Sequence, residues 1–242
     1  MRKLIFTFIT FSIIFFNGAE IYSQTVDEII ENHAKAIGGA DKLNSITSLK
    51  MSGKYSTGGF DVPMTFTLKR GGKARLDISY QGMNLIKASD ETTGWSVNPF
   101  RGNTEAVRMP AEELKAMTKY TELEGKLIGY KEKGYKVEYL GKDDFEGSEV
   151  FKLKLTDKDG DKTYYFMDVT SNLILMESSK RKIKEKEIKS RTVYGGYQSI
   201  GGIMFPMTME VIEGDRDAGD IMIIENVETN VNVDDGIFKM PK

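Results

Sequence analysis

Apolar and polar residues alternate with a period of two along most of the chain, which is the pattern of β-strands that bury one face. The clearest cases are three successive segments marked by Leu49, Met51 and Tyr55, then Met64, Phe66 and Leu68, then Ala74, Leu76 and Ile78. Further strands are predicted near residues 84–88, 94–97, 135–140, 150–156, 162–168, 172–178, 186–194, 203–212 and 220–231. The pattern predicts one antiparallel domain of about eleven strands with short turns between neighbours.

Two segments have helical spacing instead. Thr25 followed by Glu28 forms a capping box, and the apolar residues from 26 to 37 fall on one face before Gly38 and Gly39 end the helix. Pro110 suits the first turn of a second helix over residues 111–117. A short turn is expected at 40–43 and a helical or irregular piece at 123–128. The fold class is therefore mainly β (α+β), with two or three helices.

The first residues are typical of a secretory signal peptide. Arg2 and Lys3 precede an apolar stretch over residues 4–16, which is shorter than the roughly 20 residues that span a bilayer. We expect cleavage after Ser23, so that residues 1–23 are the signal peptide and residues 24–242 form the single domain. An uncleaved anchor helix is the alternative. Because the chain has no cysteine, it cannot carry a thiol-linked lipid anchor, and we expect an unanchored periplasmic protein.

The number of strands has a consequence for the interior. A sheet of about eleven strands that curls its apolar face inward is wider than its own side chains readily fill. The sequence therefore predicts an apolar cavity, lined in part by adaptable methionine and phenylalanine side chains. A fully packed sandwich or barrel is the alternative that the alternation leaves open.

Four stretches carry a resemblance to a known family: LKRGG at 68–72, SDETTGWSVNPF at 89–100, YGGYQSIGGIMFP at 194–206 and DDGIFKMP at 234–241. The first two resemble the LolA-type periplasmic proteins that carry lipoproteins to the outer membrane, and the last two are similar to the closing segments of the broader group of outer-membrane lipoprotein-sorting proteins. The resemblance implies a half-open antiparallel β-barrel of about eleven strands with a helical lid over an apolar cavity. It also implies acyl chains of lipoproteins or other lipids as cargo, an inner-membrane donor complex and an outer-membrane acceptor.

The expected cavity residues follow from the inward faces of the strands and from the second helix. They are Leu49, Met51, Met64, Phe66, Leu68, Leu76, Trp95, Leu114 and Met117. Trp95, the only tryptophan, has a second interpretation as a packed residue of the barrel wall. The resemblance implies that Arg70 hydrogen-bonds to the lid backbone and keeps the empty cavity closed, although Gly71 stands where those carriers have proline, and Arg75 is a competing candidate.

Composition and motifs argue against several other functions. With 34 basic against 36 acidic residues and a net charge of −2, the chain has no overall field for binding nucleic acid. The only histidine, His33, lies on the apolar side of the first helix without a recognisable catalytic partner, so we expect a partly buried structural histidine, no enzyme activity and no cofactor. Asp157, Asp159 and Asp161 are interpreted as a hairpin turn rather than a calcium loop, and no metal site is expected.

The sequence thus predicts a monomeric periplasmic carrier that binds acyl chains in an apolar cavity and delivers them to the outer membrane. The alternative is a binding module or sensor for a small apolar ligand that transports nothing. The basic segment 180–191 is expected to be a solvated strand pair, with docking of an acidic partner as its alternative function.

Overall fold

The computed structural model describes residues 24–183, 186–216 and 218–241, without the side chains of residues 181–188. The predicted signal peptide, residues 1–23, lies outside the described residues, as do the side chains of residues 181–188 in the basic segment 180–191; the described Lys180, Lys189 and Arg191 are exposed. In the described segments, no helix combines the length and the apolar character needed to cross a membrane.

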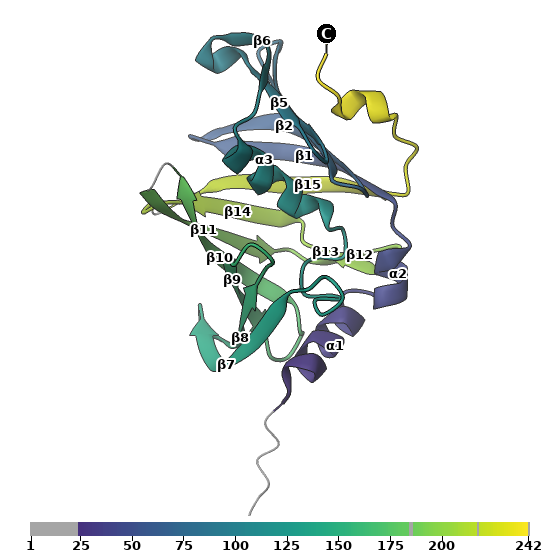
Figure 1. The fold of residues 1–242 in the computed structure, drawn as a ribbon, viewed down its shortest axis with the longest axis vertical. Helices are drawn as coiled ribbons and strands as arrows, with labels where there is room; N and C mark the ends of the chain where they lie inside the picture. The colour runs from purple at the N-terminus through teal and green to yellow at the C-terminus, as the bar shows by residue number, and fades with distance from the viewer. Residues whose placement is uncertain (1–23, 184–185, 217, 242) are drawn as a thin grey trace, which may run out of the picture.

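One large antiparallel sheet forms most of the molecule (Figure 1). Its strands are β1 (Ser48–Thr57), β2 (Phe60–Lys69), β3 (Lys73–Tyr80), β4 (Met83–Asp90), β5 (Gly94–Asn98), β6 (Asn103–Arg108), β7 (Lys136–Phe145), β8 (Ser148–Thr156), β9 (Lys162–Asp168), β10 (Ile174–Ile183), β11 (Lys186–Gly195), β14 (Thr208–Glu213) and β15 (Asp220–Thr229). Across the sheet their order is β6-β5-β4-β3-β2-β1-β15-β14-β11-β10-β9-β8-β7. The sheet does not close, so the predicted mainly-β, half-open architecture is confirmed.

The strand count differs from the prediction, because in the described residues this sheet has 13 strands rather than about eleven. The edge strand β6 was not predicted, since its sequence NTEAVR is mostly exposed and lacks alternation. The expected strand over 203–212 is divided at Pro206 and Met207 into β13 (Ile203–Phe205) and β14. β13 pairs with β12 (Gln198–Ile200) in a separate two-stranded sheet.

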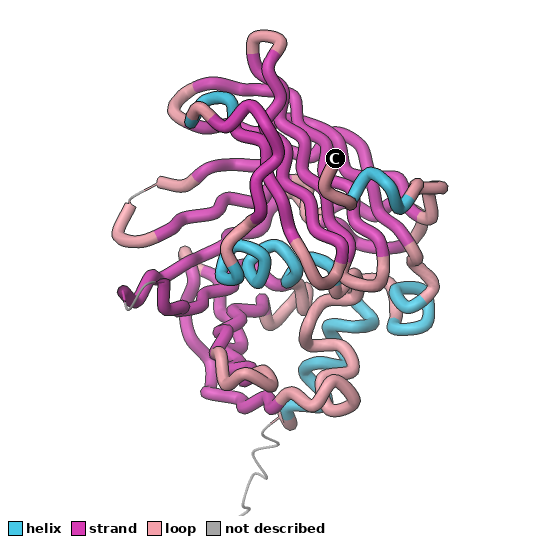
Figure 2. The backbone as a smooth tube through the Cα atoms, turned by 45° about the horizontal axis from the view of Figure 1, so that its top comes forward, coloured by secondary structure: helices cyan, strands magenta, loops and turns pink. Residues whose placement is uncertain are grey.

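The helices α1, α2 and α3 lie on the concave side of the large sheet (Figures 1 and 2). α1 (Val26–Ala36) begins with the predicted capping box of Thr25 and Glu28. The expected turn at 40–43 is a short helix, α2 (Ala40–Asn44). α3 (Ala111–Thr118) begins after Pro110 as predicted and continues into the 3₁₀ turn η2 (Lys119–Thr121). Two further 3₁₀ turns are η1 (Pro99–Arg101) and η3 (Asp235–Phe238).

The main core lies between the concave face and the helices. Four alternating positions of β2, Val62, Met64, Phe66 and Leu68, are buried in it together with Leu49 and Met51 of β1. A second core packs α1 against β7, β8 and β9 and includes Ile29, Leu153 and Met167. Because period-two alternation places these side chains on one face, the inward face of each of these strands was predictable.

His33 of α1 is buried, and its Nδ1 donates a hydrogen bond to the carbonyl oxygen of Asn172 at 2.8 Å. The expected structural histidine is therefore present, and it is more deeply buried than predicted. Burial lowers the pKa of His33 below its usual 6.5, only partly offset by the hydrogen bond to Asn172.

The pKa of His33 predicts a pH dependence of stability. Between the lowered folded-state pKa and 6.5, the unfolded chain binds more protons than the folded one, so stability is full above 6.5 and falls as the pH decreases. The free energy of unfolding falls by at most about 1.4 kcal/mol per pH unit. Urea unfolding of wild type and His33→Gln at several pH values measures it. We expect a flatter profile for the variant, and identical profiles would contradict this account.

Candidate functional site

A cavity of about 480 Å³ lies between α3 and the concave face of the sheet, and we call it the main cavity. Its apolar lining includes Phe66 of β2, Leu76 of β3, Val211 of β14, Met117 of α3 and Tyr120 of η2. The charged lining residues include Lys87, Glu113 and Lys119. This size lies in the range of binding sites for small ligands, and an apolar interior with charged groups suits an amphiphile.

Three neighbouring cavities share lining residues with the main cavity. The tip cavity, about 390 Å³, shares Leu76, Lys87 and Arg101 with it and extends along β3, β4 and β5. The polar cavity, about 620 Å³, lies toward β8 and β9 and shares Ala116 and Lys119. The α1 cavity, about 290 Å³, shares Lys119 and Tyr120. The concave side is therefore a chain of adjoining spaces divided by α3 and η2.

Ion pairs connect α3 and η2 to strands and to a turn on two sides of the cavities. Glu113 pairs with Lys87 of β4 at 2.7 Å, Lys115 reaches Asp159 and Asp161 in the β8–β9 turn, and Lys119 pairs with Glu177 of β10 at 3.6 Å. The side chains of the first two sets are about one third exposed or more, and such pairs contribute only about 0 to 1 kcal/mol each. The ion pairs therefore position α3 without fixing it strongly.

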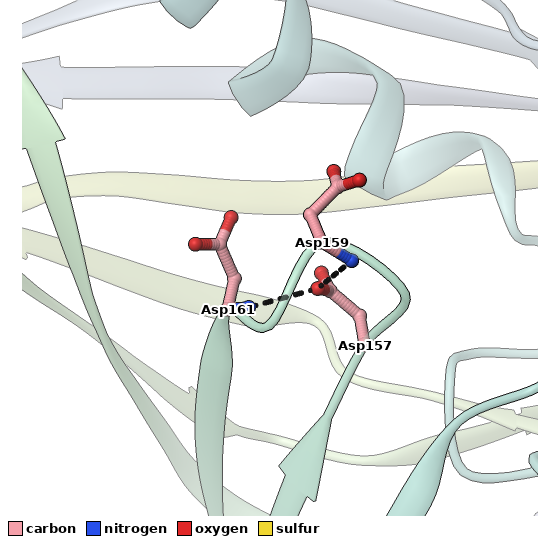
Figure 3. A group of neighbouring side chains, drawn as sticks. All are labelled: Asp157, Asp159 and Asp161. Carbon is pink, nitrogen blue, oxygen red and sulfur yellow. Dashed lines mark hydrogen bonds between the residues drawn. The ribbon is translucent and has the colours of Figure 1, made fainter.

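The aspartates that contact Lys115 form the predicted hairpin turn (Figure 3). The carboxylate of Asp157 accepts the backbone N–H groups of Asp159 at 3.1 Å and Asp161 at 3.0 Å. Lys115 Nζ lies 2.6 Å from a carboxylate oxygen of both Asp159 and Asp161. The hydrogen bond from Lys115 lowers the pKa of Asp159 below its usual value. The three carboxylates thus stabilise a turn that faces α3.

Arg70 lies at the end of α2. Its Nε donates to the carbonyl of Ile46 at 2.6 Å, one Nη donates to the carbonyl of Leu43 at 2.9 Å, and the other contacts Glu124 at 2.8 Å. Leu43 lies in the last turn of α2, whose carbonyls lack partners within the helix, and Ile46 follows the helix; one guanidinium contacts both carbonyls at once. Arg70 therefore connects the β2–β3 turn to α2 and to the loop after η2.

The glycines after Arg70 allow this placement. Gly71 and Gly72 both have positive φ, 84° and 74°. A Cβ on Gly72 would come within 2.7 Å of the Cα of Glu91, so this position requires glycine. The glycine at 71, where the carriers have proline, does not prevent Arg70 from reaching backbone carbonyls near the lid.

The predicted cavity residues are distributed over several spaces. Phe66, Leu76 and Met117 line the main cavity, and Leu76 also lines the tip cavity. Leu49 and Met51 line the α1 cavity, and Leu114 lines the polar cavity. Met64 and Leu68 belong to the core on the same concave face, where they are 3% and 4% exposed. The prediction thus identified the correct face but not its division by α3.

Trp95 lies on the other face of the sheet, which corrects its assignment to the cavity. It pairs across the strands with Ala88, and Ala88 pairs with Arg75, whereas Leu76 next to Arg75 faces the cavity. The guanidinium of Arg75 lies 5.7 Å from the Trp95 ring centroid. Trp95 is 4% exposed, so its alternative interpretation as a packed wall residue agrees with the structure.

Trp95 and Arg75 together hold the C-terminal segment. Trp95 Nε1 donates to the carbonyl of Phe238 at 2.8 Å, and Arg75 donates to the carbonyl of Ile237 at 2.8 Å. Phe238 is completely buried, and Asp235 pairs with Lys69 and Lys73. These two lysines lower the pKa of Asp235 to about 2. Arg75 therefore anchors the C-terminal segment, whereas Arg70 contacts the end of α2 and the loop after η2.

Some lining residues were not predicted from the sequence. Tyr120 packs edge to face on Phe66 with ring centroids 5.6 Å apart, and it follows α3 in a segment for which no element was predicted. Val211 was included in an expected strand, but nothing in that segment indicated which cavity it would reach. The pairing of Lys115 with Asp159 joins residues 44 positions apart, and no local pattern indicates such a contact.

Comparisons with known proteins agree with this geometry. A family model described as "Uncharacterized protein" matches residues 119–242. No curated protein matches the sequence. A DUF1329 family protein from Desulfovibrio piger is similar in structure, with a TM-score of 0.58 and 14% identity over 90% of this chain and 98% of its own.

Two further solved structures are similar. A LolA superfamily protein from Nitrosomonas europaea has a TM-score of 0.56 and 12% identity over 90% of this chain and 98% of its own. A domain assigned as an outer membrane lipoprotein-sorting protein, from Vibrio parahaemolyticus, has a TM-score of 0.54 and 12% identity over 88% of this chain and 97% of its own. At these identities the comparisons establish a shared fold, with nearly the full length of each neighbour covered.

Proposed function

Since the chain belongs to the family whose model covers residues 119–242 and has the LolA-type fold, we propose that it is an exported carrier of acyl chains. Lipoproteins are the proposed cargo, and the main cavity holds the chains away from water. The observation that supports this most is the apolar lining of that cavity by Phe66, Leu76 and Val211 beneath a weakly held helix.

The energetics of burial favour tight retention. Each buried methylene contributes about 0.8 kcal/mol, so a long acyl chain contributes roughly 10 kcal/mol before ordering costs. The main cavity adjoins the tip cavity, so a chain that outgrows one space can extend into the next. Retention of the acyl chain is therefore thermodynamically favourable, and its release is the step that needs an explanation.

Release requires a contact that favours the empty protein. In our proposal Arg70 supplies it through its bonds to the carbonyls of Leu43 and Ile46 and to Glu124. Hydrogen bonds of charged groups contribute about 1.5 to 3 kcal/mol. Closure of that strength lowers the apparent affinity for cargo by roughly ten- to a hundredfold, which favours transfer to a tighter acceptor. The resemblance to sorting proteins supports a donor at the inner membrane and an acceptor at the outer membrane.

The site supports binding rather than a reaction. His33 lines the α1 cavity, but it is buried and its Nδ1 is used by the carbonyl of Asn172. Two of the tyrosines that line the same space, Tyr165 and Tyr194, have pKa values raised well above normal by burial, so they remain neutral. We therefore propose that the cargo leaves the cavity chemically unchanged.

Competition binding tests the proposed cargo. A fluorescent fatty acid bound to the protein is titrated with a triacylated peptide and, in parallel, with the same peptide without acyl chains. We expect displacement by the triacylated peptide and none by the bare peptide. If the triacylated peptide fails to displace the fatty acid, the protein is instead a binding module for a small apolar ligand.

A further inference from the structure

An exposed group of apolar side chains lies at the end of the sheet that holds η1, and we call it the aromatic tip. It consists of Phe60, Tyr80, Met83 and Phe100, and the rings of Phe60 and Phe100 lie 6.3 and 6.1 Å from that of Tyr80. Phe60 is 61% exposed and Phe100 is 45% exposed. Three rings from separate segments that contact one another in water indicate a surface that is covered when the protein acts.

The aromatic tip comes from two hairpin turns and η1. Phe60 opens β2 after the β1–β2 turn, Tyr80 ends β3, Met83 begins β4, and Phe100 lies in η1. Figure 1 shows η1 and β6 at the end of the molecule remote from α1. Side chains that project from separate turns suit a soft surface better than a flat protein partner, because each side chain can enter a soft surface on its own.

The aromatic tip adjoins the mouth of the tip cavity. Tyr80 pairs with Met83 directly beyond Ile78 and Leu85, which line that cavity. Phe100 lies between Asn98 and Arg101, which also line it. A surface that covers the aromatic tip would therefore also face an opening that continues to the main cavity.

Two arginines line the tip cavity: Arg101 directly follows Phe100 of the aromatic tip, whereas Arg108 lies at the other end of β6, opposite Trp95. Both arginines are exposed, and among the described residues neither side chain has a hydrogen-bond or ion-pair partner. Around the aromatic tip itself, Arg101 next to Phe100 is the basic residue and Asp61 next to Phe60 is the acidic one. Aromatic rings with a neighbouring arginine are the composition of surfaces that bind at the membrane interface.

We propose that the aromatic tip docks on the surface of an anionic phospholipid bilayer. The rings enter the interface, Arg101 contacts lipid phosphates, and the tip cavity opens toward the acyl region. An acyl chain can then pass between the bilayer and the main cavity without crossing water. This inference rests on the proposed function, because it assigns the place where a carried acyl chain is loaded or released.

Vesicle flotation tests the docking. Vesicles of phosphatidylcholine with phosphatidylglycerol are compared with vesicles of phosphatidylcholine alone, using wild type and Phe60→Ser/Phe100→Ser. We expect the wild type to prefer anionic vesicles and binding to weaken about tenfold for each ring removed. Arg101→Gln is expected to remove the preference for anionic vesicles while the rings still bind.

Leu140→Ser is the matched control, because Leu140 is 46% exposed on the edge strand β7. It should bind vesicles as the wild type does, and an equal loss in this variant would overturn the proposal. The proposal would also be overturned if the wild type did not bind vesicles. It would be overturned as well if sedimentation showed a wild-type dimer that dissociates in Phe60→Ser/Phe100→Ser. Fatty-acid binding is measured in the same samples. If it persists while docking fails, only the docking is wrong, whereas its absence contradicts the proposed function.

Discussion

Phe66→Asp is expected to weaken binding of a fluorescent fatty acid by about a hundredfold or more, roughly 2.7 kcal/mol. Phe66 lines the main cavity, and its cross-strand neighbours Met51 and Leu76 are apolar. A carboxylate there loses hydration when an acyl chain enters, and no positive side chain on either neighbouring position compensates it. Binding is measured by titration of the fluorescent fatty acid, with urea unfolding as the check on folding.

Because Phe66 is only 5% exposed, its aspartate variant can also destabilise the fold, so a second pair of variants is needed. Val211→Asp places a carboxylate in the same cavity at a half-buried position. Leu140→Asp places one on the exposed face of β7, outside the lining of the four cavities. We expect binding to be lost in Val211→Asp and kept in Leu140→Asp. Equal affinity in both variants would mean that the acyl chain binds elsewhere.

Arg70→Leu should slow the transfer of a bound fluorescent fatty acid to acceptor vesicles by about ten- to a hundredfold. In our account the contacts of Arg70 with Leu43, Ile46 and Glu124 are made in the empty protein and are broken on loading. Removing them stabilises the loaded state relative to the empty one. Stopped-flow measurement of the transfer rate, together with the equilibrium affinity, gives the size of the effect.

Arg75→Leu is the matched control, because Arg75 lies on the opposite face and binds the C-terminal segment through the carbonyl of Ile237. This variant should lower the free energy of unfolding while the transfer rate of the folded protein stays that of the wild type. Equal transfer rates for Arg70→Leu and wild type would remove the latch from the mechanism. Equal slowing in both arginine variants would show that a general loss of stability is responsible.

Much of the fold could be predicted because it depends on local patterns. The alternation in β1, β2 and β3 specifies which face is buried, since a shift by one residue would expose it. The capping box at Thr25 and the proline before α3 mark helix starts by the same local chemistry. The predicted inward residues Phe66 and Leu76 accordingly line the main cavity.

The remaining features depend on contacts between distant segments. The sequence left two interpretations of Trp95, as a cavity residue and as a packed wall residue. The hydrogen bond from Trp95 to the carbonyl of Phe238, 143 residues away, favours the second, and no local pattern indicates that contact. The subdivision of the concave side depends on where α3 lies, and α3 and η2 make their contacts with distant segments, such as that of Lys115 with the β8–β9 turn and that of Tyr120 with Phe66. β6 escaped prediction because an exposed edge strand needs no alternation.

Native mass spectrometry of the protein purified from cell envelopes tests the central claim most directly, with Phe66→Asp prepared in parallel. The account predicts that the wild type retains an acyl-bearing lipid in the main cavity and that the variant is free of it. A wild-type protein that carries no lipid, and that takes up neither fatty acid nor triacylated peptide when these are added, would contradict the account.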